Sequence, residues 1–283
     1  DIGGTGIKFA SLTPDGKILD KTSTPTPEIL EDLLAWLDQR LSEQDYRGIA
    51  MSVPGAVNQK TGVIEGISAI PYIHGFSWYE ALSHHKLPVH LENDANCVGL
   101  SELLAHPEIE NAACVVIGTG IGGAMIINGK LHRGRHGLGG EFGYMTTIEP
   151  AEKLNNWSQL ASTGNMVRYV IEKSGQTDWD GRKIYQEAAA GNVLCQEAIE
   201  RMNRNLAQGL LNIQYLIDPD VISLGGSISQ NPDFIKGVQE AVDTFVERYE
   251  EYTIAPVIQA CTYQADANLY GALVNWLQEE NQW

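Results

Sequence analysis

Short apolar runs bounded by glycine, proline or asparagine recur through the first half of the chain and predict buried strands. Residues 7–12 and 17–20 alternate apolar with polar positions across a Thr-Pro-Asp-Gly turn. Further strands are expected at 48–53, 89–92, 112–117 and 124–127, the last followed by an Asn-Gly hairpin turn.

Leucines at helical spacing predict an amphipathic helix over 28–43, with Leu30, Leu33, Leu34, Leu37 and Leu41 on one face. The second half of the chain has a mainly helical pattern, interrupted by one buried strand at 221–224. Its helices are expected near 158–173, 182–190, 195–217, 234–250 and 268–280.

The opening pattern returns roughly 110–120 residues later, a separation larger than the periods of about 20–50 residues that mark solenoids. Both copies have the order strand, glycine-rich turn, strand, hairpin turn, strand. The repeat predicts two similar α/β domains, in keeping with about two domains for 283 residues.

Composition excludes several functional classes. The chain has 19 Lys and Arg against 36 Asp and Glu, and this net charge of −17 argues against a nucleic-acid partner. No apolar stretch is long enough to span a membrane and no signal peptide is evident. Four scattered cysteines without a CxxC pair argue against a cysteine zinc ribbon and fit a reducing, cytoplasmic location.

The first candidate site is the glycine-rich turn Asp-Ile-Gly-Gly-Thr-Gly-Ile-Lys at residues 1–8. Such a turn usually follows a strand, so we expect strand residues before Asp1. Glycines let backbone N–H groups approach a phosphate, and a nearby carboxylate, Asp1, is explained if it holds Mg²⁺ through water. Thr5 and Lys8 would add a hydroxyl and a positive charge. The alternative is a plain hairpin turn, because one glycine cluster is weak support.

A second glycine-rich turn, Gly-Thr-Gly-Ile-Gly-Gly at 118–123, lies between two apolar strands. Alone it is equally compatible with a tight turn. Two such loops at equivalent positions of a repeat predict a cleft between two domains in which phosphates are held from both sides.

A third motif, Glu-Asn-Asp-Ala-Asn at 92–96, stands between a predicted strand and a predicted helix. Asp94 at a strand end could act as a general base toward an attacking hydroxyl. On residue type alone a helix N-cap is the more common role for Asn and Asp in such a place.

Two further glycine-rich segments follow these motifs in the chain. Glu141, within the segment 133–144, could accept hydrogen bonds from sugar hydroxyls, or the segment could be a solvated flexible loop. Gly225 and Gly226 follow an apolar strand, where they could admit a base or ribose close to the backbone or simply form a strand-to-helix turn.

Together and in this order, the motifs resemble the ROK family of sugar kinases over essentially the whole chain. They are residues 1–8, Pro54 with Gly55, 92–96, 118–123, 137–144 and 224–227. The resemblance implies a duplicated ribonuclease-H-like fold, as in hexokinase and actin, with an ATP and sugar cleft between two α/β domains. It implies an N-terminal domain of residues 1–110 plus 268–283, a C-terminal domain of residues 111–267, and a homodimer.

The resemblance also implies residue roles. Asp94 would deprotonate the sugar 6-hydroxyl, with Asn93, Glu141 and Gly55 among the substrate contacts. The phosphates of ATP would be surrounded by Gly4, Thr5, Gly118, Thr119 and Gly120, with Asp1 and Lys8 beside them. The adenosine would lie near Gly225 and Gly226.

The chain departs from the family pattern at the zinc loop. Tyr144 stands where a zinc-ligating histidine is expected, no cysteine lies between Cys114 and Cys195, and Ser158 replaces a sugar-contacting glutamate. We therefore expect no structural zinc. Loss of groups that face the anomeric side of the sugar would make room for a substituent there, as in the zinc-lacking β-glucoside kinases of the family.

The resulting prediction is an ATP- and Mg²⁺-dependent sugar 6-kinase acting on a β-glucoside, glucose or N-acetylmannosamine. The helix-turn-helix domain of the repressor members is not expected, because the phosphate loop stands at residue 1. Two alternatives remain at this point: a sugar-binding sensor with little kinase activity, and an acetate-kinase-like or actin-like ATPase.

Overall fold

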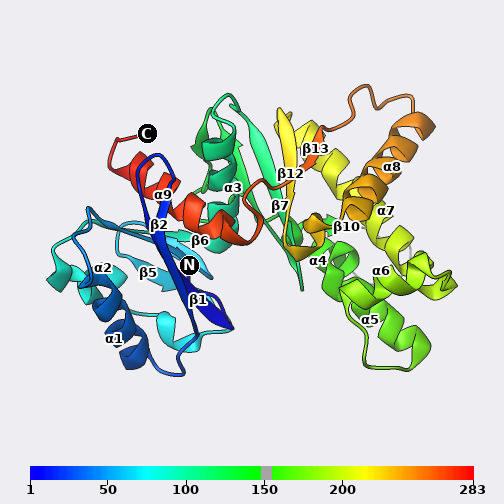
Figure 1. The fold of residues 1–283 in the computed structure, drawn as a ribbon. Coiled ribbons are helices and arrows are strands. Elements are labelled where there is room, and N and C mark those ends of the chain that lie inside the picture. Colours follow the sequence, from blue (N-terminus) through cyan, green and yellow to red (C-terminus); the bar gives the residue numbers. More distant parts are fainter. Residues whose placement is uncertain (148–154) are drawn as a thin grey trace. The chain divides into compact units, whose positions relative to one another are not determined.

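Two α/β units, each with its own apolar core, make up the chain (Figure 1). The computed structural model describes residues 1–147 and 155–283. The first unit consists of Asp1–Pro107, Arg133–Gly139 and Asp266–Trp283, and the second of Glu108–His132 and Gly140–Ala265. The short segment Arg133–Gly139 thus belongs to the first unit although both of its flanks belong to the second.

Strands of the first unit pair two by two. The antiparallel pairs are β1 (Gly6–Leu12) with β2 (Ile18–Pro25) and β4 (Ala56–Asn58) with β5 (Val63–Glu65). The parallel pair is β3 (Ile49–Val53) with β6 (Val89–Asn93), in which Val53 lies opposite Asn93. Both β3 and β6 therefore end at the same edge.

The helices of the first unit are α1 (Leu30–Leu41), α2 (Trp78–Ala81), α3 (Asp94–Ala105) and α9 (Ala267–Glu279). Helix α1 buries Leu33, Leu37 and Leu41, which confirms the predicted leucine stripe. Helices α3 and α9 approach so closely that a Cβ atom on Gly271 would lie 1.7 Å from the Cys97 carbonyl oxygen. The absent side chain of Gly271 is thus a requirement of helix packing.

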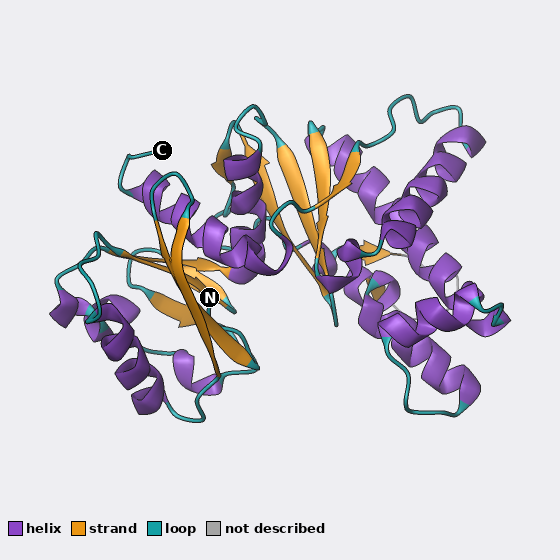
Figure 2. Cartoon of the chain, viewed as in Figure 1, coloured by secondary structure: helices purple, strands orange, loops and turns teal. Residues whose placement is uncertain are grey.

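The second unit is built on a five-stranded sheet with the order β13-β12-β7-β8-β9 (Figure 2). Its strands are β7 (Ala112–Ile117), β8 (Ile121–Ile127), β9 (Lys130–Leu131), β12 (Val221–Gly225) and β13 (Ile258–Ala260). Strands β7, β12 and β13 run parallel, and β8 and β9 continue the sheet in antiparallel pairing. A separate short pair joins β10 (Thr146–Thr147) to β11 (Asn155–Asn156).

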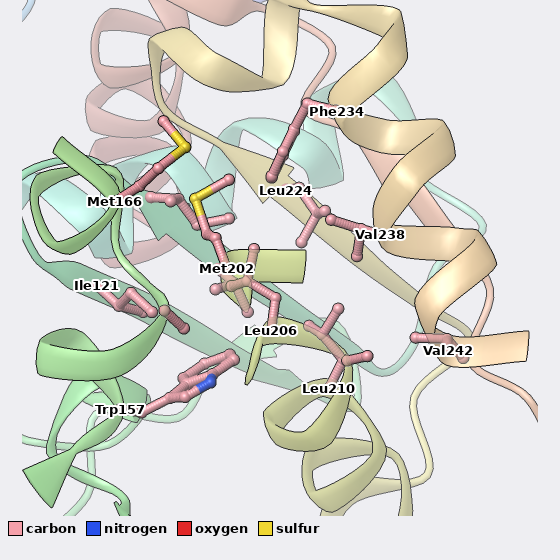
Figure 3. Packing of buried hydrophobic residues seen from close by; sticks show 14 of the residues in the cluster. Ile121, Trp157, Met166, Met202, Leu206, Leu210, Leu224, Phe234, Val238 and Val242 are labelled. Atoms are coloured by element: carbon pink, nitrogen blue, oxygen red, sulfur yellow. The ribbon is translucent and has the colours of Figure 1, made fainter. Parts of the chain in front are cut away.

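Five described helices accompany this sheet: α4 (Trp157–Ala161), α5 (Thr163–Ser174), α6 (Gly181–Ala189), α7 (Val193–Ile217) and α8 (Pro232–Arg248). Figure 3 shows the core between them and the sheet, formed by Ile121, Trp157, Met166, Met202, Leu206, Leu210, Leu224, Phe234, Val238 and Val242. Of the helices in the described part of the chain, none is long and apolar enough to cross a membrane.

The predicted helices agree with α1, α6, α7, α8 and α9 to within two residues at each end. The single helix expected at 158–173 is wrong, because the chain breaks at Ser162 into α4 and α5. Ser162 has an extended backbone (φ −78°, ψ 156°), is fully buried, and accepts a hydrogen bond from the Asn165 N–H at 3.1 Å. Its hydroxyl caps the new helix, a role that apolar periodicity does not reveal.

Candidate active site

Polar residues gather where the parallel strands β3 and β6 end. Asn93 closes β6, and its Nδ2 donates a hydrogen bond to the carbonyl oxygen of Gly55 at 3.1 Å. Gly55 has φ +102°, and a Cβ atom there would come within 2.9 Å of the Glu65 carbonyl oxygen. Both the backbone conformation and the space therefore require glycine at this position. The structure brings the predicted residues Gly55, Asn93 and Asp94 together.

The structure shows which residue caps helix α3. Asn93 is the N-cap of α3, since its Oδ1 accepts a hydrogen bond from the Asn96 N–H at 3.1 Å. Asp94 is the first helical residue, and its Oδ1 accepts from the Ala95 N–H at 2.8 Å. The capping role that residue type favoured thus falls on Asn93 and is not needed from Asp94.

Burial raises the pKa of the Asp94 carboxyl above its ordinary value, although hydrogen bonds from Ala95 and Asn93 act in the opposite direction. A carboxylate with a raised pKa holds a proton more strongly and so is a better general base near neutral pH. The raised pKa is thus a property that a proton acceptor would need.

Glu92 lies immediately before Asn93 and Asp94, and the sequence alone indicates no role for it. Its side chain is 2% exposed, and its Oε2 lies 2.6 Å from Nε of Arg133. No sequence pattern connects these two residues, which are separated by 41 positions and meet only in the folded unit.

The glycine-rich turn of the first unit places Gly4 and Thr5 at its exposed tip. Lys8 Nζ lies 3.4 Å from Asp1 Oδ2, and Asp1 Oδ1 accepts a hydrogen bond from Asn268 Nδ2 at 3.0 Å. Burial lowers the pKa of Lys8. One carboxylate beside an exposed turn fits Mg²⁺, which keeps several waters and binds through one or two carboxylates plus substrate phosphates.

In the second unit the corresponding turn joins β7 to β8, with Gly118, Thr119 and Gly120 exposed. It is a tight turn in which the Gly118 N–H donates to the Gly120 carbonyl oxygen at 2.9 Å. The beginning of α5 lies against it, because the Gly164 N–H donates to the Gly118 carbonyl oxygen at 3.1 Å. A helix N-terminus carries positive partial charge, so this loop is a favourable environment for an anion.

Gly225 and Gly226 lie at the same edge of the sheet as the turn between β7 and β8. Strands β7 and β12 are parallel neighbours, and Gly225 lies opposite Val116 just before the exposed turn. Gly226 has φ +90°, and a Cβ atom there would overlap the carbonyl oxygen of Ile117. Ligands of open α/β sheets bind outside the carboxyl ends of parallel strands. The residues predicted to contact phosphate and adenosine in the second unit therefore lie at one edge of the sheet, at the carboxyl ends of β7 and β12.

Glu141 precedes a short 3₁₀ turn (Phe142–Tyr144) in the second unit. Ser158 accepts a hydrogen bond from the Ile121 N–H at 2.9 Å and donates to the Ile121 carbonyl oxygen at 3.2 Å. Its hydroxyl thus braces α4 against β8, a structural role not expected from the sequence. A Cβ atom on Gly143 would overlap Ile121 and Ser158, so part of the glycine density of this segment serves packing rather than flexibility.

Among the described residues, one group offers three potential metal ligands: Asp38, His84 and His85. Nε2 of His84 and Nε2 of His85 lie 3.0 and 2.7 Å from Oδ1 of Asp38. Hydrogen bonds between the imidazoles and the carboxylate account for this arrangement.

Comparison with known proteins adds independent information. The family model described as "ROK family" matches residues 1–279. A β-glucoside kinase of Listeria monocytogenes is 35% identical, over 100% of this chain and 97% of that protein. The crystal structure of a ROK family protein from Streptococcus pneumoniae in complex with sucrose is 90% identical, with a TM-score of 0.98 over 100% of this chain and 98% of that one. A ROK hexokinase from Thermus thermophilus is 26% identical, with a TM-score of 0.85 over 99% and 97% of the two chains.

Proposed function

Because the chain belongs to the ROK family and is a carbohydrate kinase with the actin- and hexokinase-like fold, we propose that it transfers the γ-phosphoryl group of MgATP to the 6-hydroxyl of a β-glucoside. The observation that carries the mechanism is the half-buried Asp94, with the raised pKa of its carboxyl, at the junction of β6 and α3. A sugar hydroxyl is a weak nucleophile until a base accepts its proton.

In the proposed reaction the sugar 6-oxygen attacks the γ-phosphorus as its proton passes to the Asp94 carboxylate. Asn93 holds the backbone before Asp94 in place, because its side chain makes two hydrogen bonds. Its Nδ2 donates to the Gly55 carbonyl oxygen, and its Oδ1 accepts from the Asn96 N–H. Positioning of this kind and neutralisation of charge supply most of the rate in phosphoryl transfer.

The phosphates are assigned to the two glycine-rich turns, around Gly4 and Thr5 in the first unit and Gly118, Thr119 and Gly120 in the second. Lys8 contributes positive charge to the first turn, and the start of α5 contributes it to the second. Asp1 would hold Mg²⁺ through water, and the ion when bound supplies further neutralisation of phosphate charge.

A β-glucoside is preferred over a free hexose for two reasons. The 35% identical relative is named a β-glucoside kinase, which supports the β configuration. The structure of the 90% identical protein is a complex with sucrose, whose glucose ring carries a substituent at the anomeric carbon in the α configuration, so it supports a substituted anomeric carbon. In addition, Tyr144 and Ser158 replace the histidine and glutamate that the family resemblance assigns to the anomeric side.

The test is sugar-dependent release of ADP measured over cellobiose, gentiobiose, methyl β-glucoside, sucrose, glucose and N-acetylmannosamine. We expect the highest kcat/KM with a β-glucoside and no product from its 6-deoxy analogue. A higher kcat/KM with a free hexose would overturn the substrate assignment. Sugar binding without ADP release would identify a sensor, and sugar-independent ATP turnover an ATPase.

The phosphate role of the second glycine turn gives a separate prediction for Gly118→Ala. A Cβ atom at Gly118 meets nothing within 4 Å, so the unfolding midpoint should not change. The same methyl group would occupy space next to the backbone that a phosphate approaches, and we expect KM for ATP to rise about fivefold or more. KM for the sugar is the internal control. An unchanged KM for ATP would contradict phosphate binding by this turn.

A further inference from the structure

An ion pair between the buried Glu92 and the half-buried Arg133 adjoins the residues assigned to catalysis. Glu92 is 2% exposed, and its Oε2 contacts Nε of Arg133 at 2.6 Å and Nε2 of Gln59 at 3.2 Å. Burial by itself would lower the pKa of the Arg133 guanidinium, but the carboxylates of Glu92 and Glu279 outweigh it and raise that pKa above its usual value. A buried carboxylate is tolerated when it is paired and hydrogen-bonded in this manner.

The second carboxylate oxygen of Glu92 holds the beginning of α3. Oε1 accepts hydrogen bonds from the Asn93 N–H at 2.8 Å and from Nδ2 of Asn96 at 2.9 Å. Hydrogen bonds to an ionised acceptor are stronger than neutral ones. The backbone immediately before Asp94 and the first turn immediately after it are therefore both fixed by one charged oxygen.

Arg133 is itself held at two other points. Its Nη2 donates to Oδ1 of Asn275 at 2.7 Å and to Oε1 of Glu279 at 3.1 Å, both on α9. Arg133 opens the segment Arg133–Gly139, which belongs to the first unit between two stretches of the second. The Arg133 guanidinium thus links the segment Arg133–Gly139 to helix α9 and to the end of β6.

From these contacts we infer that Glu92 and Arg133 form a positioning pair for the base, in which Arg133 neutralises and holds the Glu92 carboxylate and Glu92 fixes the backbone on both sides of Asp94. The inference rests on the proposed function, in which Asp94 is the base. Neither residue is assigned a contact with sugar or ATP, so their loss should lower kcat rather than raise KM.

Removal of the cation alone is the most damaging change. Arg133→Met leaves the Glu92 carboxylate buried without its cation, so the contacts that fix the backbone around Asp94 lose their support. We expect kcat to fall about 10- to 30-fold, because small displacements of a reacting group have large effects on rate.

Two neutral double variants test the positioning role without an unpaired charge. Glu92→Gln with Arg133→Met keeps an oxygen that can accept from the Asn93 N–H, whereas Glu92→Ala with Arg133→Met does not. We expect the glutamine variant to exceed the alanine variant about tenfold in kcat, with KM for sugar and for ATP alike in the two variants. These two variants decide the matter even if Arg133→Met does not fold.

The matched control is Arg40→Met, because Arg40 is an ion-paired arginine of the first unit with a similar side-chain exposure, 22% against 27% for Arg133. It should leave kcat within about twofold of the wild type, since its partner Glu43 lies on the surface. All variants are compared at saturating sugar and ATP, with sugar binding and unfolding midpoints recorded in parallel.

Equal kcat values for the two double variants, or an unchanged kcat for a folded Arg133→Met, would overturn the positioning role. The wild type separates this failure from that of the proposed function. If the wild type phosphorylates a sugar and the variants do so equally well, only the positioning inference falls; if the wild type releases no ADP with any sugar, the proposed function falls first.

Discussion

Replacement of Asp94 by asparagine is expected to lower kcat about 10²- to 10⁴-fold while sugar binding persists. Asparagine has nearly the same shape, and its side-chain oxygen can still accept the hydrogen bond that the Ala95 N–H donates at 2.8 Å. It cannot accept the proton of the attacking hydroxyl. The measurement is kcat from ADP release at saturating sugar and ATP, with sugar binding followed by calorimetry. Near-normal turnover would refute Asp94 as the base.

The same variant has an expected effect on stability, with a sign set by the raised pKa. Because the folded-state pKa of Asp94 lies above its unfolded value, the folded protein binds this proton more tightly than the unfolded chain does. The contribution of Asp94 to the free energy of unfolding therefore falls as the pH rises from its unfolded-state pKa through its folded-state pKa. The asparagine side chain carries no charge, so Asp94→Asn should be more stable than the wild type at neutral pH, and this advantage should disappear below both pKa values.

Asp38→Asn is a control in the same unit, because its effect on stability at neutral pH should be opposite to that of Asp94→Asn. Partial burial would raise the pKa of Asp38, but hydrogen bonds from His85 and His84 outweigh it and lower the pKa. Its ionised form is thus favoured by folding, and the asparagine variant should be less stable at neutral pH. Denaturant unfolding of both variants between about pH 4 and pH 8 measures the two signs. A loss of stability at neutral pH in Asp94→Asn would contradict the argument from burial.

Gly271→Ala is expected to destabilise the protein by about 3 kcal/mol or more, although alanine is the better helix former by about 1 kcal/mol. The new methyl group would lie 1.7 Å from the Cys97 carbonyl oxygen of α3. That oxygen belongs to helix backbone and cannot move aside as a side chain can. Helices α3 and α9 must separate, and the contacts between them weaken. Urea unfolding monitored by circular dichroism gives the free energy directly.

Gly118→Ala is the matched control for this effect, since it makes the same substitution where a Cβ atom meets nothing within 4 Å. The free energies of unfolding of Gly271→Ala and Gly118→Ala should differ by nearly the full destabilisation expected for Gly271→Ala. A Gly271→Ala protein as stable as Gly118→Ala would show that α3 and α9 have more freedom than their packing indicates.

Much of the local structure could be predicted from the sequence, because it depends on periodicity along a few consecutive turns or strand residues. The leucine stripe of α1 and the apolar run of β7 are encoded in this way. So are the glycine-rich turn at Gly118, which follows a predicted strand, and the polar motif around Asp94, which lies between a predicted strand and a predicted helix. The family resemblance rests on the order of these local motifs.

Other features were decided only by the tertiary structure. Residue type could not say whether Asn93 or Asp94 caps α3; the hydrogen bond that Asn93 Oδ1 accepts from the Asn96 N–H gives the answer, and the bond from Asn93 Nδ2 to Gly55, in the turn between β3 and β4, holds the side chain in place. Glu92 and Arg133 meet across 41 positions of sequence. Periodicity describes which face of an element is buried, but not which distant groups will share that interior. The pairing of a buried charge, and the pKa of a carboxyl beside it, depend on those neighbours and on the exclusion of water that folding produces.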